Sequence, residues 1–373
     1  MKLAAPVLHP DNPSQQLLRS GYCLESPIIR RMIDMGIQVI YVEYPELDCL
    51  DRHLGVHLSP ARQAIYSGIK SSMSQVQKQT RPSIPYDDYC STTRELIDTL
   101  LNQGQNPIYL DQMSRQGGDA VAHAAAVAHL SLLLGLKLEN YLISQRTRLP
   151  SQRAKDVVSL GVAGMLHDLG VCKLPEALWG YSDAEPPEKE NELREWQTHV
   201  AIGYELIRTN VETTAAAAVY QHHQHFDGSG FPQRKTDEGL ASTLGGDRIH
   251  VFARILAAAN LYDRLANPGN GRRRSNLQVF RLIESRHGAW CDPEILRVLK
   301  AVAPPFPPGC RVRLTDGVMA IVIDVNPAKP MKPTIRRLAE DNWTMVGEDL
   351  DLSADGAPGI ADEGEDRCAQ AAV

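Results

Sequence analysis

Residues 156–170, DVVSLGVAGMLHDLG, decide the fold of this chain. The stretch is apolar and has helix-forming residues until it reaches the adjacent polar pair His167-Asp168. Gly170 then allows the chain to turn at once. We therefore expect a buried helix that brings an imidazole and a carboxylate to the edge of the core.

Three further stretches are rich in alanine and leucine and predict helices, namely residues 120–138, 214–226 and 252–266. The chain is expected to be almost wholly helical from 116 to 303 and mainly α overall. Around this domain we predict a small N-terminal α/β unit with connecting helices over residues 1–115. A small β unit follows over 304–345, where strand-like alternation around Asp316-Gly317 indicates a short β-hairpin.

Residues 346–373 contain eight acids and one base, so they account for the whole net charge of −6 and leave the rest of the chain close to neutral. Their low hydrophobicity predicts an acidic disordered tail. A nearly neutral body argues against DNA as a partner but leaves room for a small anionic ligand.

The cysteine pattern and the hydropathy indicate a cytoplasmic protein that makes no use of a membrane. The seven cysteines are odd in number and form no CxxC pair, which favours reduced thiols over a disulfide framework. The N-terminus has too short an apolar stretch for a signal peptide, and we expect no membrane helix, which needs about 20 apolar residues.

Eight of the twelve histidines fall between residues 123 and 250. Imidazole and carboxylate are ligands for borderline divalent metals, and an ordered set of them in an apolar helical domain suggests an inward-facing metal centre. The candidate ligands are His123, His167, Asp168, His199, His222, His223 and, one helical turn before His123, Asp119. This number is sufficient for a two-metal site, which suits phosphodiester hydrolysis.

Each of these features also has an ordinary structural interpretation. A helical histidine is more often packed in a core than bound to a metal. His222, His223 and His225 can form a solvated helix end, with Asp227-Gly228 as a simple turn. It is their combination, in one order and in one helical domain, that favours the metal centre.

The order resembles the HD-GYP subgroup of the HD phosphohydrolase superfamily over roughly residues 116–303. The family signature HDxGK…HHExxDGxGYP is matched by His167-Asp168-Leu169-Gly170 and, further on, by His222-His223 with residues 227–232, DGSGFP. His199 matches the intervening family histidine and His123 the early one, and Asp119 stands where some members carry a glutamate ligand. The N-terminal unit is similar, more loosely, to one found ahead of many such domains.

The resemblance implies an HD-GYP-type helical domain with two or three iron or manganese ions. It implies hydrolysis of cyclic di-GMP to pGpG or GMP in second-messenger signalling, with His167 and Asp168 at the catalytic centre. Phosphate-contacting arginines are expected near Arg272 and Arg273, although a solvated loop is an alternative interpretation of that segment.

Three positions depart from the family pattern. The family lysine after HDxG is Val171 here, the glutamate after the histidine pair is Gln224, and the last ligand aspartate of ARILxxxDxxDAL is Asn260. Asn260 can still bind a metal through its carbonyl oxygen, and Lys173 is a candidate replacement for the missing lysine. Asp263 matches the pattern's second aspartate, which is not a ligand.

Two classes of function therefore stay open. The leading hypothesis is a metal-dependent cyclic di-GMP phosphodiesterase, attenuated by Val171 and Asn260. The alternative is a catalytically degenerate domain that senses cyclic di-GMP or acts as a scaffold for a signalling partner. Retention of six buried polar ligands opposes that alternative, because burying polar groups is costly. A third hypothesis, an HD nucleotidase, does not explain the second histidine pair.

Overall fold

The structure is a computed structural model, and most of the chain can be described in it. The described residues are 2–4, 6–9, 12–35, 37, 40, 42–43, 59–79, 82–102, 120–235, 241–268, 273–339 and 344–363.

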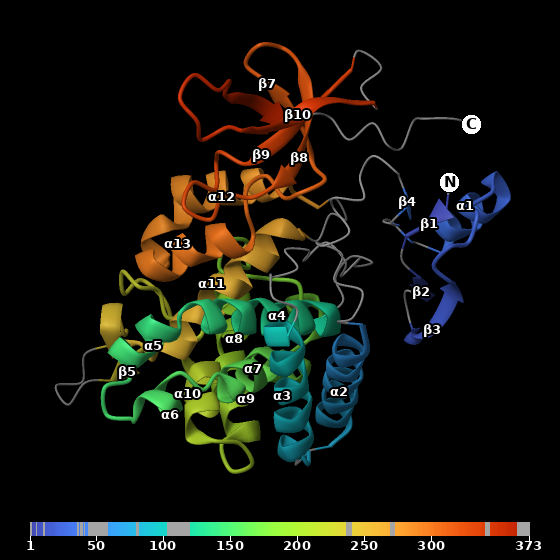
Figure 1. The fold of residues 1–373 in the computed structure, drawn as a ribbon. Helices are drawn as coiled ribbons and strands as arrows, with labels where there is room; N and C mark the ends of the chain where they lie inside the picture. Colours follow the sequence, from blue (N-terminus) through green and yellow to red (C-terminus); the bar gives the residue numbers. More distant parts are fainter. Residues whose placement is uncertain are drawn as a thin grey trace. The chain divides into compact units, whose positions relative to one another are not determined.

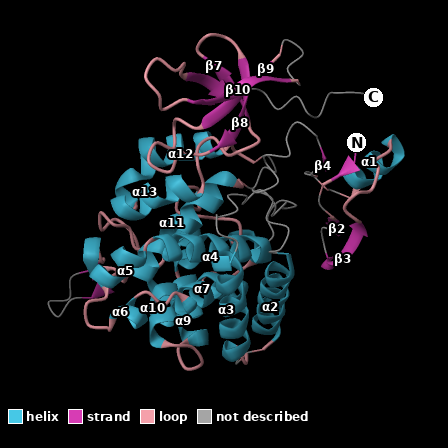
Figure 2. Cartoon of the chain, in the orientation of Figure 1, coloured by secondary structure: helices cyan, strands magenta, loops and turns pink. Residues whose placement is uncertain are grey.

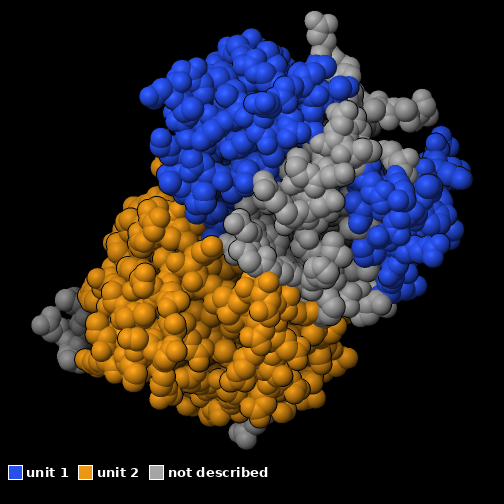
Figure 3. Space-filling view, in the orientation of Figure 1, with its two compact units in different colours: residues 1–56, 105–116, 300–373 blue, residues 57–104, 117–299 orange. Residues whose placement is uncertain are grey.

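The chain divides into two compact units, which are coloured separately in Figure 3. One contains residues 57–104 and 117–299 and is helical; the other contains residues 1–56, 105–116 and 300–373. The helical unit resumes at residue 117, next to the expected boundary at residue 115, but residues 57–104 group with the helical unit as well. Helices α2 (Ser59–Lys78) and α3 (Tyr86–Asn102) pack against α4 (Ala120–Lys137) and α7 (Val158–Leu166) respectively.

The helical unit confirms the mainly α architecture (Figure 1). Its remaining α-helices are α5 (Glu139–Gln145), α6 (Ser151–Ala154), α8 (Glu190–Gln197), α9 (His199–Ile207), α10 (Thr213–Gln221), α11 (Val251–Ala266), α12 (Asn276–Leu282) and α13 (Pro293–Val302), the last of which extends into the other unit. Short 3-10 or π segments are η4 (Leu169–Lys173), η5 (Glu176–Leu178), η6 (Gly246–Arg248), η7 (Ile283–His287) and η8 (Gly288–Trp290), and a two-stranded ribbon joins β5 (Arg234–Lys235) to β6 (Ala241–Ser242).

The centre of the helical unit is a close crossing of α4 and α7. Almost every side chain of these two helices is buried, so both are surrounded by the core on nearly all sides. At the crossing, a Cβ atom added to Gly164 would lie 2.5 Å from the Cα of Ala128. Small residues therefore let the two backbones approach, and this approach brings His123 on α4 towards His167 at the end of α7.

Helix α11 packs against α4 and α10 and begins at an unusual cap. The His250 side chain accepts a hydrogen bond from the backbone N–H of Phe252 through Nδ1, at 3.1 Å. Only a neutral imidazole with a free Nδ1 lone pair can accept this bond. Burial, with the nearby Arg146 and Arg254, lowers the pKa of His250 from 6.5 to about 4.

We predict that this cap contributes to acid sensitivity. Because the folded-state pKa of His250 lies below its unfolded value, protonation favours the unfolded chain, and stability is lost as the pH falls from about 6.5 to 4. His250→Asn keeps a capping acceptor without a titrating group. In urea unfolding of metal-free protein, the variant should lose about 1–3 kcal/mol less than wild type over this range. Parallel stability curves for the two proteins would contradict the prediction.

The C-terminal part of the chain forms an antiparallel five-stranded sheet in the order β10-β9-β8-β7-β11 (Figure 2). Its strands are β7 (Arg311–Leu314), β8 (Met319–Asp324), β9 (Thr334–Leu338), β10 (Met345–Asp351) and β11 (Ile360–Glu363). The expected hairpin is present: β7 and β8 pair across a turn in which Gly317 has a φ of 84° and the Asp316 carboxylate accepts the backbone N–H of Val318. The β unit is nevertheless larger than a hairpin.

The expectation of a disordered tail from residue 346 is wrong for residues 346–363. β10 pairs with β9 and β11 pairs with β7, so the chain beyond residue 345 supplies both outer strands of the sheet. The acidic side chains of β10 are exposed, and Asp349 accepts a hydrogen bond from Arg336 at 2.8 Å. Acidic residues on the outward face of an edge strand are thus compatible with order. Residues 364–373 lie outside the described part.

The N-terminal α/β unit is present in outline. It contains helix α1 (Ser26–Asp34), and β1 (Lys2–Leu3) pairs with β4 (Val42–Glu43). A second ribbon joins β2 (Val7–His9) to β3 (Asn12–Leu18). Leu3, Val7, Leu24 and Met32 form its small buried cluster.

Helix α4 is more apolar than expected. Among the described residues it is the one helix long and apolar enough to cross a membrane, but 78% of that window is buried inside the structure. This burial is typical of a core helix, in agreement with its place beside α7.

Candidate metal centre

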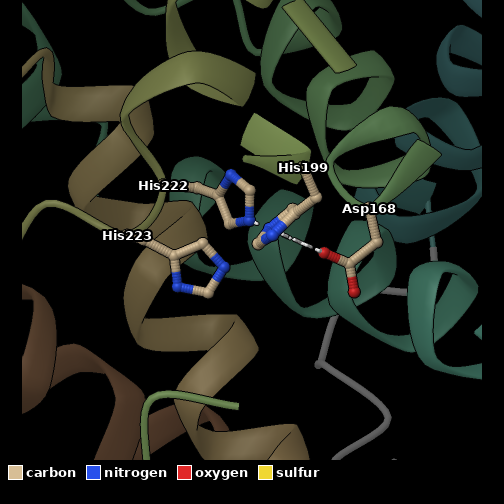
Figure 4. Close-up of side chains that lie close together, drawn as sticks. All are labelled: Asp168, His199, His222 and His223. Carbon is tan, nitrogen blue, oxygen red and sulfur yellow. Dashed lines mark ion pairs between the residues drawn. The ribbon is translucent and has the colours of Figure 1, made fainter. Parts of the chain in front are cut away.

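Four helices deliver the candidate ligands to one place. His123 comes from the first turns of α4, and His167-Asp168 follow the last residue of α7. His199 is the first residue of α9, and His222-His223 follow α10. Figure 4 shows Asp168, His199, His222 and His223 around a common point.

The ligand atoms form two groups that share Asp168. One group contains Asp168, His199, His222 and His223, the other His123, His167 and Asp168, and within each group the ligand atoms lie within 4.8 Å of one another. All six side chains are buried. Six of the eight residues predicted as metal ligands are therefore together in space.

Backbone carbonyls fix the orientation of three of these rings. Nδ1 of His167, His199 and His222 lies within hydrogen-bonding distance of the carbonyl three residues earlier, at 2.9, 2.6 and 2.7 Å. A carbonyl only accepts, so Nδ1 carries the proton and Nε2 keeps its lone pair. This arrangement is the usual support for a histidine that binds a metal.

Carboxylates orient the other two histidines. Nδ1 of His123 lies 2.5 Å from Asp263, and Nδ1 of His223 lies 2.5 Å from Asp183. Asp263 therefore supports a ligand, in agreement with its expected place outside the ligand set. Asp183 was not predicted, because it comes from a loop 40 residues before His223 and belongs to no motif.

The residues present fit a divalent metal. Within the described part of the chain, Nε2 of His199, Nε2 of His222 and Oδ1 of Asn260 are buried and have no hydrogen-bond partner. Such orphaned atoms cost free energy unless a ligand satisfies them. The site thus offers inward-facing nitrogen and oxygen donors that can hold a metal ion.

The electrostatics favour the metal-binding form of His123, His199 and Asp168. Burial, followed by the cation of Arg264, lowers the pKa of His123 to about 3, and burial with nearby His223 lowers that of His199 to about 4. Burial alone raises the pKa of Asp168, but His167 and Arg264 outweigh it and hold this pKa well below its ordinary value. Neutral imidazoles around an ionised carboxylate are the species that bind metals.

Arg264 is a second residue that the motif analysis missed. Its Nη2 lies 2.8 Å from Oδ2 of Asp168. It follows Asn260 by four residues on α11, so both lie on the same helical face. That spacing alone does not distinguish a residue of the site from an ordinary surface arginine.

The other expected site residues have mixed outcomes. Asp119 and Arg272 lie outside the described residues. Arg273 is described and is partly buried. Lys173 is exposed and its Nζ donates to the backbone carbonyl of Gln79, at 2.9 Å, which gives it a partner away from Asp168. Asn260 is buried on the face of α11 that carries Arg264.

The second motif forms the wall beside His223. The Phe231 ring stacks on the His223 ring, with centroids 4.5 Å apart and planes 13° apart. The Gln224 side chain donates from Nε2 to the carbonyl of Pro232 at 2.6 Å, and its Oε1 accepts the backbone N–H of Leu244 at 2.9 Å. Gln224 therefore ties the DGSGFP loop to the segment that leads to α11.

Gln224→Glu, which restores the family residue, is expected to destabilise this chain. A carboxylate cannot donate to the Pro232 carbonyl, so two acceptors would face each other in a buried place. We expect the unfolding free energy to fall by about 2–3 kcal/mol in urea denaturation. The same change at exposed Gln233 is the control and should have little effect. Equal effects at the two positions would show that the Gln224 bonds carry no stability.

Comparison with known proteins agrees with this geometry. Residues 136–295 match the family model of the HD domain. The chain is 22% identical to the cyclic di-GMP phosphodiesterase PA4108 of Pseudomonas aeruginosa over 291 residues, 76% of this chain and 62% of that protein. It is 29% identical to the cyclic di-GMP phosphodiesterase response regulator RpfG of Xanthomonas campestris pv. campestris over 156 residues, 40% of this chain and 34% of the relative.

Two further similarities were found. The chain is 24% identical over 260 residues to the 3'3'-cGAMP-specific phosphodiesterase 2 of Vibrio cholerae, covering 63% of this chain and 42% of that protein. A solved HDG"Y"P protein from Bdellovibrio bacteriovorus, Bd1817, aligns with a TM-score of 0.44 and 14% identity over 81% of this chain and 95% of that one. The chain spans less than two thirds of the length of each curated relative.

Residues 136–295 of the helical unit thus match an HD domain, and the His167-Asp168 pair lies among side chains that can hold a metal ion. More narrowly, the second histidine pair and the DGSGFP loop beside it match the HD-GYP pattern within this chain.

Proposed function

We propose that this chain is a metal-dependent phosphodiesterase that hydrolyses cyclic di-GMP to pGpG or GMP in cytoplasmic second-messenger signalling. The observation that carries the proposal is the convergence of six buried ligand side chains whose free donor atoms face one another. The two relatives named as cyclic di-GMP phosphodiesterases support the choice of substrate.

The donor set supports iron or manganese as the ions. Nitrogen donors from five histidines and oxygen donors from Asp168 and Asn260 suit borderline divalent metals. When bound, two such ions would stabilise the attacking and leaving oxygens of a phosphodiester. The protein's own part is to hold the imidazoles by their Nδ1 atoms and to keep Asp168 ionised. We also propose a signalling protein as a partner.

The alternative function is a degenerate domain that binds cyclic di-GMP without cleaving it. The neutral Asn260 favours it, as does Val171, which is buried and leaves no cation at the position of the family lysine. Since a lysine there would be buried as well, Val171→Lys is a poor test. Asn260→Asp is the sharper one, because it adds a negative ligand where a neutral oxygen is orphaned.

We predict that Asn260→Asp raises turnover of cyclic di-GMP about 10-fold or more at limiting manganese. The reason is that an anionic oxygen holds a divalent cation more strongly than an amide oxygen. Turnover is followed by chromatography of pGpG and GMP, with binding of cyclic di-GMP measured in parallel. An inactive parent that binds the dinucleotide and gains activity would be a sensor; no binding and no turnover in either protein would refute the substrate assignment.

A further inference from the structure

The two oxygens of Asp168 face different halves of the metal centre. Oδ1 lies 3.7 Å from Nε2 of His199 and 3.6 Å from Nε2 of His222. Oδ2 lies 3.5 Å from Nε2 of His123 and 3.4 Å from Nε2 of His167. We define the Oδ1 subsite as Asp168 Oδ1 with His199, His222 and His223, and the Oδ2 subsite as Asp168 Oδ2 with His123 and His167.

The two subsites differ in their donors. The Oδ1 subsite combines three imidazoles with a carboxylate oxygen, whereas the Oδ2 subsite combines two imidazoles with the other oxygen of the same carboxylate. The carboxylate of Asp263 is hydrogen-bonded to Nδ1 of His123. Asn260 adds no charge. The Oδ2 subsite therefore has one imidazole fewer than the Oδ1 subsite.

A fixed positive charge lies on the Oδ2 side. Nη2 of Arg264 donates to Oδ2 of Asp168 at 2.8 Å, and no shorter contact to that oxygen is found among the described residues. The Arg264 side chain is only 18% exposed, so solvent screens it weakly. A guanidinium stays protonated in proteins, so this cation cannot be removed by a change in pH.

We propose that Arg264 is a resident cation of the Oδ2 subsite, which therefore binds its divalent ion more weakly than the Oδ1 subsite. The guanidinium stabilises the charge of Asp168 when the Oδ2 subsite is empty, and it repels an incoming ion. The inference rests on the proposed function only in that the centre holds divalent metal. It follows that the protein keeps one ion tightly and exchanges the other, so its activity follows the free metal concentration.

The test is a titration of the metal-free full-length protein with Mn²⁺ alone, followed by calorimetry and by the electron paramagnetic resonance of free Mn²⁺. Wild type should show two classes of site. Arg264→Gln should tighten the weak class roughly 10- to 100-fold, as expected for removal of a unit charge a few ångströms away. The tight class should change less than 3-fold. Arg264→Lys keeps the charge and should leave the weak class weak.

Arg281→Gln, at an exposed arginine of α12, is the matched control and should resemble wild type. Equal affinities for two ions in wild type would overturn the inference, even if Arg264→Gln failed to fold in circular dichroism. A folded Arg264→Gln with an unchanged weak class would overturn it too. In both cases the protein would still bind metal ions, so the proposed metal-dependent function would not be refuted. A wild-type protein that binds no Mn²⁺ would instead refute the metal centre itself.

Discussion

Replacing His167 and Asp168 together by alanine is expected to strip the bound metal and to lower any hydrolysis at least about 10³-fold. Asp168 supplies an oxygen to each of the two subsites. Among the described residues it is the one ligand that the two groups share. Loss of an essential part of a catalytic centre typically has effects of this size. Metal content by mass spectrometry and turnover of cyclic di-GMP measure the two effects.

The fold of this double variant should persist, because the backbone of α7 makes its helical hydrogen bonds without these side chains. Arg264 loses its partner, and we expect the unfolding free energy to fall by about 1–3 kcal/mol. His250→Asn removes a partly buried histidine outside both subsites and is the control for metal content. A double variant with its full metal complement would show that the ligands are elsewhere.

Gly170→Ala is expected to have the largest effect on folding. A Cβ atom at Gly170 would lie 2.0 Å from the carbonyl oxygen of His199 and 2.6 Å from the backbone nitrogen of Gly203. Both are backbone atoms, so α9 has to move, and with it His199. We expect a loss of at least about 3 kcal/mol in unfolding free energy, together with weaker Mn²⁺ binding.

Two other glycines provide a graded comparison for this prediction. A Cβ atom at Gly203 would meet its nearest neighbour at 3.4 Å, an ordinary contact, and one at exposed Gly180 would meet nothing within 4 Å. Stability measured by urea unfolding should therefore fall steeply for Gly170→Ala and little for Gly203→Ala or Gly180→Ala. Similar losses at all three positions would show that the contact between η4 and α9 does not restrict the chain.

The parts of the site that could be predicted are those that motifs encode locally. His167-Asp168 and His222-His223 are adjacent pairs at helix ends, and their order along the chain was enough to group them. Asp183 and Arg264 could not be found in this way, because each acts on a ligand distant in sequence. Lys173 shows the converse: the sequence places it two residues from Val171, but the structure directs it to Gln79.

The fold was predictable to a similar extent. Apolar, alanine-rich stretches predicted the central helices, since a helix buried on all sides needs no polar face. The acidic composition of residues 346–363 led to the wrong prediction of disorder. Composition alone does not show that an exposed acid of β10 pairs with Arg336 on the neighbouring strand. Composition likewise does not indicate that residues 57–104 group with the helical unit, because the packing of α2 against α4 and of α3 against α7 is a tertiary contact.

The crossing of α4 and α7 restricts which amino-acid substitutions such a metal centre can accept. Gly164 and Ala128 are in contact there, and neither accepts a larger side chain without moving a helix that carries ligands. Substitutions that would alter the spacing between the ligands therefore disturb the helix packing, whereas substitutions that alter only the charge of the centre do not. Asn260, which stands where the family pattern has an aspartate, alters the charge of the centre and leaves this backbone frame unchanged. The affinity of such a centre for metal can therefore change while its fold stays the same.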